Sequence, residues 1–306
     1  MGELIVAMAG TPTGERAALA LALLSALSHA VFGAVVKGGA DAHLNRGAIN
    51  ICYAAIAAPF ALFVFPPPTP QLWAILAGVY VIHLIYEYTQ VRSLSIGGFT
   101  VVYPLARGTG PMVTAIAAGI VFGEAFTGVQ WAGLLVLTLS IYGLAWANLQ
   151  ATGLDGPAAI RQLRAAIATA LLSGVMIAIY TVYDAYGIRV ADDPFTFLAW
   201  FFVVGGFGYP VIAAIRWRRM TPPDRPDPRK LALRGFCGAL IAFVSFGSVM
   251  LAMRLDKVGE AAAVREMSIV FATAIGVLIF REKIDARRLA LIGGIVAGAI
   301  VIEAAG

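Results

Sequence analysis

The chain has 306 residues, of which 60% are hydrophobic and 13% are charged, and its mean hydropathy is +0.85. Because soluble proteins carry about 25% charged residues, this composition excludes a soluble globular protein and indicates an integral membrane protein in a lipid bilayer. The net charge of +5 does not indicate a nucleic-acid partner, because the basic residues lie in short loops, where they would orient the chain in a membrane.

Ten apolar runs, each long enough to cross a bilayer, follow one another along the chain. Short loops separate them, so no soluble domain is expected. The predicted spans are residues 17–37, 44–65, 70–92, 99–122, 128–147, 165–188, 195–217, 231–254, 260–280 and 286–303. The sequence therefore predicts an all-α integral membrane protein with ten transmembrane helices.

The fourth predicted span carries a cation between two prolines. Residues 97–111 read GGFTVVYPLARGTGP and place Arg107 between Pro104 and Pro111. A cation near the middle of a span costs about 2.5 to 3.5 kcal/mol on insertion scales, so it normally faces a polar interior or an ion partner. Each proline also leaves a neighbouring backbone carbonyl free. We interpret the stretch as part of a substrate cavity; the alternative is a buried, paired arginine that only orients helices.

The stretch around Arg107 has a counterpart later in the chain. Residues 104–124 align without gaps with residues 262–282, so that Arg107 matches Arg265, while the two prolines have no counterpart. An internal repeat of this kind predicts two related halves, each of which takes five of the ten spans.

The predicted halves are residues 1–150 and 151–306. Because five is an odd number, the second half enters the membrane inverted relative to the first. Inverted repeats are the architecture in which a substrate site lies near the membrane midplane, in a central cavity between the repeats.

Four segments resemble the drug/metabolite transporter superfamily, and within it the ten-helix proteins with two EamA-type repeats. The segments are residues 111–124, with their spacing from Pro111 to Glu124, the corresponding arm of the second half, which ends in Arg281 and Glu282, the first-span stretch SALSHAVFGAVVK, which ends at Lys37, and YTVYDAYGIR in the sixth span. The resemblance covers essentially the whole chain and is strongest to bacterial metabolite exporters, including the YddG-type amino-acid exporters. It implies a secondary transporter of small molecules in the bacterial inner membrane. Ile269 aligns with Pro111, so the second half lacks this proline, which departs from the family pattern.

Polar and aromatic side chains within the spans would line the cavity. Tyr80, His83 and Glu87 share one face of the third span; a His–Glu pair there could carry a proton, or the stripe could only fix helix packing. The candidate substrate-binding residues are Arg107, Arg265, Tyr80, His83, Glu87, Tyr103, Tyr180, Tyr183, Asp184, His29 and Phe32. A guanidinium binds a carboxylate, an acid or a tyrosine binds an amine, and aromatic walls contact the rest. These groups together suit amino acids with aromatic or other largely apolar side chains.

Alternating access would need a flexible region near Arg107. We expect Pro104, Gly108, Gly110 and Pro111 to act as this hinge. Because the prolines have no counterparts in the second half, we expect more motion there than around Arg265.

Several alternatives stay open at this stage. The solute could be a drug or a phosphorylated metabolite, or the chain could be an intramembrane enzyme or a receptor. The chain lacks the HExxH, GxSG and GxxxxGK[ST] motifs, so enzyme chemistry and ATP-driven transport have no support. Cys52 and Cys237 lie in apolar runs with no neighbouring ligand pattern, so we expect no metal and no cofactor. We expect a monomer, in which the glycines Gly294 and Gly298 allow close helix packing inside one chain.

The basic loops also predict an orientation. Sixteen of the 22 Lys and Arg residues lie in loops, or at the span ends beside them, on the side of the membrane opposite the termini, and four lie on the side of the termini. Since cytoplasmic loops carry the excess of positive charge, this count places both termini outside the cytoplasm, whereas the resemblance implies cytoplasmic termini. We follow the count.

Reporter fusions at Gly306 test this orientation. Alkaline phosphatase, which is active only outside the cytoplasm, should be active in the fusion, and green fluorescent protein, which fluoresces when it folds in the cytoplasm, should be dark. The opposite pattern would overturn the orientation.

Overall fold

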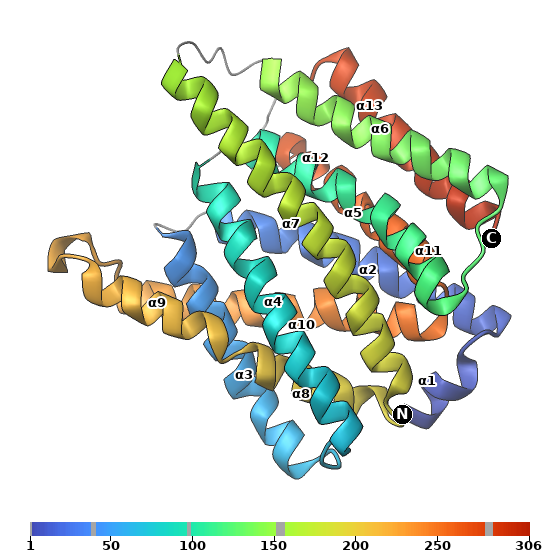
Figure 1. The fold of residues 1–306 in the computed structure, drawn as a ribbon, viewed down its shortest axis with the longest axis horizontal. Helices are drawn as coiled ribbons and strands as arrows, with labels where there is room; N and C mark the ends of the chain where they lie inside the picture. The colour runs from blue at the N-terminus through green and yellow to red at the C-terminus, as the bar shows by residue number, and fades with distance from the viewer. Residues whose placement is uncertain (1, 38–40, 97–98, 151–156, 279–283) are drawn as a thin grey trace. The chain divides into compact units, whose positions relative to one another are not determined.

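The computed structural model describes residues 2–37, 41–96, 99–150, 157–278 and 284–306, and every regular element in these ranges is a helix (Figure 1). Arg281 and Glu282, which contributed to the resemblance, lie outside these ranges. The elements are α1 (Gly2–Met8), α2 (Pro12–Lys37), α3 (Ala42–Phe63), α4 (Pro70–Ile96), α5 (Phe99–Phe122), α6 (Gly128–Gln150), α7 (Pro157–Val190), α8 (Pro194–Gly205), α9 (Gly208–Arg219), η1 (Pro222–Asp224), α10 (Pro228–Leu255), α11 (Val258–Arg265), α12 (Met267–Leu278) and α13 (Ala286–Ala304). The predicted all-α fold is confirmed.

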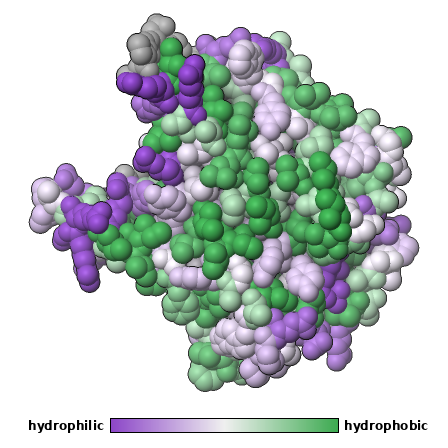
Figure 2. Space-filling model, viewed as in Figure 1, coloured by the Kyte–Doolittle hydropathy of each residue, from purple (hydrophilic) through white to green (hydrophobic). Residues whose placement is uncertain are grey.

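Eight of the ten predicted spans correspond to a single long helix, and the other two are each divided in two. The span 195–217 consists of α8 and α9, and the span 260–280 consists of α11 and α12. In the described part of the chain, eight stretches are long and apolar enough to cross a membrane. Large apolar side chains are also exposed along the helices, and Figure 2 shows such residues over much of one face. The chain is a multi-pass integral membrane protein.

Aspartates cap the N-termini of several helices. Asp41 precedes α3, and its Oδ1 accepts hydrogen bonds from the backbone N–H groups of His43 and Leu44, both at 3.0 Å. Asp193, Asp227 and Asp285 cap α8, α10 and α13 in the same way, and a proline follows the first two. A short acceptor side chain satisfies N–H groups that have no partner inside the helix, and proline suits the first helical position.

The helices pack into two compact units. The first consists of residues 1–87 and 183–256, where α10 packs against both α2 and α3, and α3 also contacts α8 and α9. The second consists of residues 88–182 and 257–306, where α6 packs against α5 and α13, and α11 against α5. Each unit therefore combines helices from both predicted halves. The predicted halves, residues 1–150 and 151–306, are repeats in the sequence and not compact units in space, so that division stays a prediction.

The contact between α6 and α13 depends on two glycines. A Cβ atom added at Gly298 would lie 2.7 Å from the carbonyl oxygen of Gly133 and 2.8 Å from Cβ of Leu137, and one added at Gly294 would lie 2.2 Å from Oγ of Ser140. Small residues let helix backbones approach closely in a membrane. Such close packing matters there because the hydrophobic effect does not drive helices together in lipid. The expected role of Gly294 and Gly298 in packing within one chain is confirmed.

Gly298→Ala should destabilise the protein, because the new methyl group meets backbone that cannot move aside. We expect a cost of about 1 to 3 kcal/mol, measured as a lower Tm in detergent. Gly293→Ala is the matched control: nothing lies within 4 Å of its added Cβ, so the change should be neutral or stabilise the helix by up to about 1 kcal/mol. Equal Tm values for the two variants would contradict this packing.

Candidate functional site

Arg107 is buried on α5 and bonds to three acceptors around one helix end. Its Nε donates to Oε2 of Glu266 at 3.0 Å, and its Nη2 donates to the carbonyl oxygen of Arg265 at 3.3 Å and to Oγ of Ser268 at 3.2 Å. Arg107 and Glu266 are each only 3% exposed. Arg107, the cation that we expected to face a polar interior or an ion partner, therefore forms a buried ion pair within the second unit.

The acceptors of Arg107 are available because the ninth span is interrupted. Helix α11 ends at Arg265, α12 begins at Met267, and Glu266 lies between them. The N–H of Ile269 bonds to the carbonyl of Glu266 instead of the carbonyl of Arg265, which it would meet in a continuous α-helix. The carbonyl of Arg265 accepts from the guanidinium of Arg107. Interrupted helices are tolerated in membranes where other groups satisfy the freed backbone in this way.

Arg265 and two tyrosines complete this cluster. Nη1 of Arg265 lies 3.5 Å from the hydroxyl of the buried Tyr180 on α7, and the side chain of Tyr103, one turn before Arg107 on α5, lies close to that of Ser268. The structure thus brings together four of the predicted residues, Arg107, Arg265, Tyr103 and Tyr180. We name these four residues, together with Glu266 and Ser268, the arginine cluster.

A second polar cluster lies in the first unit, around Glu87 of α4. Arg46 of α3 forms an ion pair with Oε1 of Glu87, and Nδ2 of Asn50 donates to Oε2 of Glu87 at 2.8 Å. Nδ2 of Asn50 and the hydroxyl of Tyr53 also donate to the carbonyl oxygen of Gly205, at 3.3 and 3.0 Å. Gly205 is the last residue of α8, so this cluster also lies at an interrupted span.

His83 and Glu87 share one face of α4 but have different partners. Nε2 of His83 lies 2.8 Å from Oδ2 of Asp184 on α7, and its ring meets the ring of Phe201 edge-on at 5.0 Å. Both His83 and Asp184 are buried. A proton role for His83 therefore has to be considered with Asp184, from another helix.

The remaining predicted residues of the first unit make packing contacts. A Cβ added at Gly78 would lie 2.0 Å from the hydroxyl of Tyr183, and one added at Gly208 would lie 3.1 Å from the ring of Tyr80. His29 and Phe32 both lie on α2, and their rings stack with centroids 6.1 Å apart. Nδ1 of His29 also lies 3.3 Å from Oγ of Ser245 on α10.

The predicted hinge lies in an unbroken helix. Helix α5 continues through Pro104 and Pro111, and Cβ atoms added at Gly108 and Gly110 would each come 3.1 Å from an isoleucine, Ile141 and Ile177 respectively. These glycines allow close packing against α6 and α7. Their role in motion stays a prediction.

Five polar residues of the clusters were not among the predicted site residues: Arg46, Asn50, Tyr53, Glu266 and Ser268. Arg46 lies near the start of the predicted span 44–65 and was counted among the loop cations. Asp41 is the signal that could have corrected this, because a cap at that position starts the helix at Ala42 and places Arg46 a full turn inside it. Within the described residues, no group of three His, Cys, Asp or Glu side chains could hold a metal ion.

Comparison with known protein families gives a result for the second half of the chain, which contains the interrupted α11–α12 span. Residues 164–304 match the EamA-like transporter family. The EamA-like segment begins within α7 and continues into α13, and it includes Arg265, Glu266 and Ser268. The resemblance to EamA-type repeats is confirmed for this half.

Comparisons with whole proteins describe the fold. A search of curated proteins gave no match. Among solved structures 28 chains match, and one of them, described as "Crystal structure of protein", is 17% identical with a TM-score of 0.69. The match covers 93% of this chain and 94% of that chain. At this identity the likeness shows that the two chains share a fold.

The ion pair of Arg46 and Glu87 should couple strongly in a double-mutant cycle. Arg46→Met leaves the carboxylate of Glu87 buried without its cation, which should cost about 3 to 5 kcal/mol and lower the Tm in detergent. Arg46→Met/Glu87→Leu removes both charges and should regain most of that loss. Arg287→Met, which removes an exposed arginine bonded to Gln150, should change the Tm little. Additive effects of the two single substitutions would show that the pair is not coupled.

Proposed function

We propose that the whole chain is a secondary transporter of the EamA-like family that exports small zwitterionic metabolites by alternating access. Amino acids with aromatic or other largely apolar side chains are the first candidates. The observation that carries the proposal is the arginine cluster, which places ion-pairing groups inside the membrane at an interrupted helix. The proposal includes a monomer in a bacterial inner membrane, without enzyme activity.

The charges of the arginine cluster suit a zwitterion. Arg107 and Glu266 form an ion pair, so their charges neutralise each other. Separating a buried pair is costly because each charge has lost its hydration, so a solute must replace both halves of the interaction. A zwitterion does this with no net charge added, since its carboxylate can pair with Arg107 and its ammonium group with Glu266.

The neighbouring groups extend this recognition. Arg265 supplies a second guanidinium for the carboxylate, and the hydroxyls of Tyr103 and Ser268 lie next to Arg107 and offer hydrogen bonds to the solute. Guanidinium and carboxylate make strong, directional pairs, which favours binding of an α-carboxylate in one orientation. The rings of Tyr103 and Tyr180 provide apolar surface for a side chain.

The arginine cluster also supports a second candidate solute. It holds two guanidinium groups against one carboxylate, an excess of one positive charge that would favour an anion such as a phosphorylated metabolite. A quaternary-ammonium drug suits the cluster less well, because it would have to bind beside two cations.

Counterflow in proteoliposomes tests the proposal. Vesicles loaded with unlabelled amino acids should take up labelled aromatic amino acids, and Arg107→Gln should reduce the rate at least ten-fold because the carboxylate loses its partner. Arg107→Gln/Glu266→Gln should be equally inactive while it elutes as a folded monomer, which separates loss of function from loss of fold. Arg161→Gln, at an exposed position on α7, should transport normally.

Two results would contradict this assignment. Wild-type rates in the double variant would remove the arginine cluster from the site. Exchange of phosphorylated metabolites without exchange of any amino acid would replace the zwitterion with an anion.

A further inference from the structure

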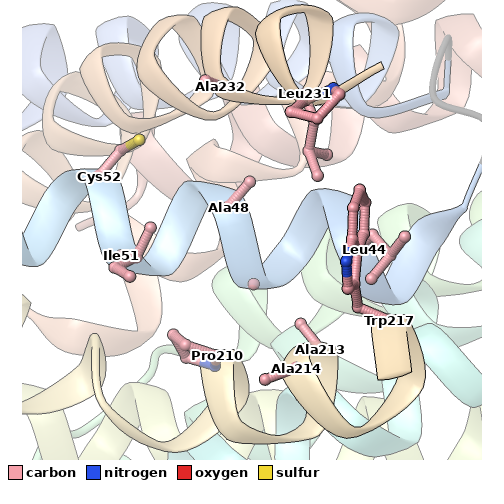
Figure 3. A pocket seen from close by; sticks show the side chains of 12 residues that line it. Leu44, Ala48, Ile51, Cys52, Pro210, Ala213, Ala214, Trp217, Leu231 and Ala232 are labelled. Carbon is pink, nitrogen blue, oxygen red and sulfur yellow. The ribbon is translucent and has the colours of Figure 1, made fainter. Parts of the chain in front are cut away.

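A groove runs along α3 between α9 and α10, in the first unit. Its volume is about 310 Å³, at the lower end of the roughly 300 to 1,000 Å³ typical of small-molecule sites. Figure 3 shows Ile51 and Ala48 of α3 between Ala213 and Trp217 of α9 and Leu231 and Ala232 of α10. The lining is almost entirely apolar, so the groove suits a hydrocarbon chain.

Small side chains create the groove. Ala214 on α9 and Ala232 on α10 line it and are both exposed, so neither helix fills the space above α3. Closer to α3 the packing is tight: a Cβ added at Gly47 would lie 2.3 Å from Cβ of Ala213, and one added at Gly235 would lie 3.0 Å from Cβ of Ala48. The floor of the groove is therefore fixed by close helix contacts, while its outer side is open.

Basic residues gather where α9 ends and α10 begins. Between residues 216 and 234 there are seven arginines and lysines and two aspartates. Both aspartates bond locally: Asp224 accepts from Thr221, and Asp227 caps α10 through the N–H of Arg229. Figure 2 shows hydrophilic residues gathered where α9 ends.

Most of these cations have no acidic partner among the residues that the structure describes. Arg216 pairs with Asp41 at 2.6 Å, but the exposed residues Arg218, Arg219, Arg229 and Lys230 have no ion pair within the described ranges. They are adjacent in sequence to lining residues, since Arg218 follows Trp217 and Lys230 precedes Leu231. The open end of an apolar groove therefore carries uncompensated positive charge.

Trp217 connects the apolar and the charged parts of this site. Its ring lines the groove, and the guanidinium of Arg225 lies over that ring, 5.4 Å from the centroid. Tryptophan is enriched at the level of lipid head groups, because its ring is apolar and its N–H is polar. From this preference we infer that the end of α9, with its neighbouring cations, lies at the depth of lipid phosphates.

We propose that this groove binds an anionic phospholipid, with one acyl chain along α3 and the phosphate near Arg218, Arg225, Arg229 and Lys230. The apolar lining alone would accept any lipid, whereas the unpaired cations favour a lipid with net negative charge over a zwitterionic one. The site is separate from the arginine cluster and does not depend on the transported solute.

Native mass spectrometry of the purified full-length protein tests this inference. The protein is equilibrated in detergent with equal amounts of phosphatidylglycerol and phosphatidylcholine that have identical acyl chains. We expect phosphatidylglycerol to be retained about ten-fold more than phosphatidylcholine. Arg229→Gln/Lys230→Gln should reduce this preference to near unity. The matched control, Arg161→Gln/Arg164→Gln on α7, removes two exposed cations elsewhere and should leave it unchanged.

A second variant tests the position of the acyl chain. Ala214→Leu/Ala232→Leu fills the groove from two exposed positions, so it should fold with an unchanged Tm and lose retention of both lipids. Equal retention of the two lipids by the wild type, an equal loss of preference in the α7 control, or full retention in the filled variant would overturn the inference. A wild-type dimer that the filling substitutions dissociate would also overturn it, by assigning the groove to a second copy of the chain.

Discussion

A guanidinium inside a membrane-spanning helix must find its partners within the protein, because the surrounding hydrocarbon offers none. Arg107 meets this constraint by bonding to the carboxylate of Glu266, the hydroxyl of Ser268 and the carbonyl oxygen of Arg265. The interruption of the ninth span and the buried cation therefore depend on each other. Without Arg107, the carbonyl of Arg265 would lose its hydrogen-bond donor. Without the interruption, that carbonyl would be bonded within the helix and could not accept from Arg107.

The first unit follows the same rule at the other interrupted span. The carbonyl of Gly205, at the end of α8, accepts hydrogen bonds from Asn50 and Tyr53, and Asn50 also bonds to Glu87, which pairs with Arg46. Each unit thus contains one interrupted span whose last carbonyl is satisfied by side chains from a neighbouring helix. Charged groups held this way are fixed in position inside the membrane, which is what selective binding of a polar solute requires.

The spans were predictable because apolar runs of membrane length are a strong signal, and Arg107 stood out as a cation within one of them. The partners were not predictable in the same way. The interruption at Glu266 has no glycine or proline beside it, whereas α5 continues through both of its prolines. His83 lies on the face of Glu87 yet pairs with Asp184, 101 residues later in the chain. Contacts between helices depend on how the helices pack, which periodicity within one helix does not reveal.

The central claim is that the arginine cluster is where a solute binds during transport. Accessibility of a single cysteine at position 268 tests this most directly, using Ser268→Cys in a chain whose Cys52 and Cys237 are replaced by alanine. A membrane-impermeant thiol reagent is applied from each side of oriented proteoliposomes. The account predicts labelling from both sides, slowed by saturating amino acid. Labelling from neither side would contradict it, because a cluster that only holds helices together stays closed to water.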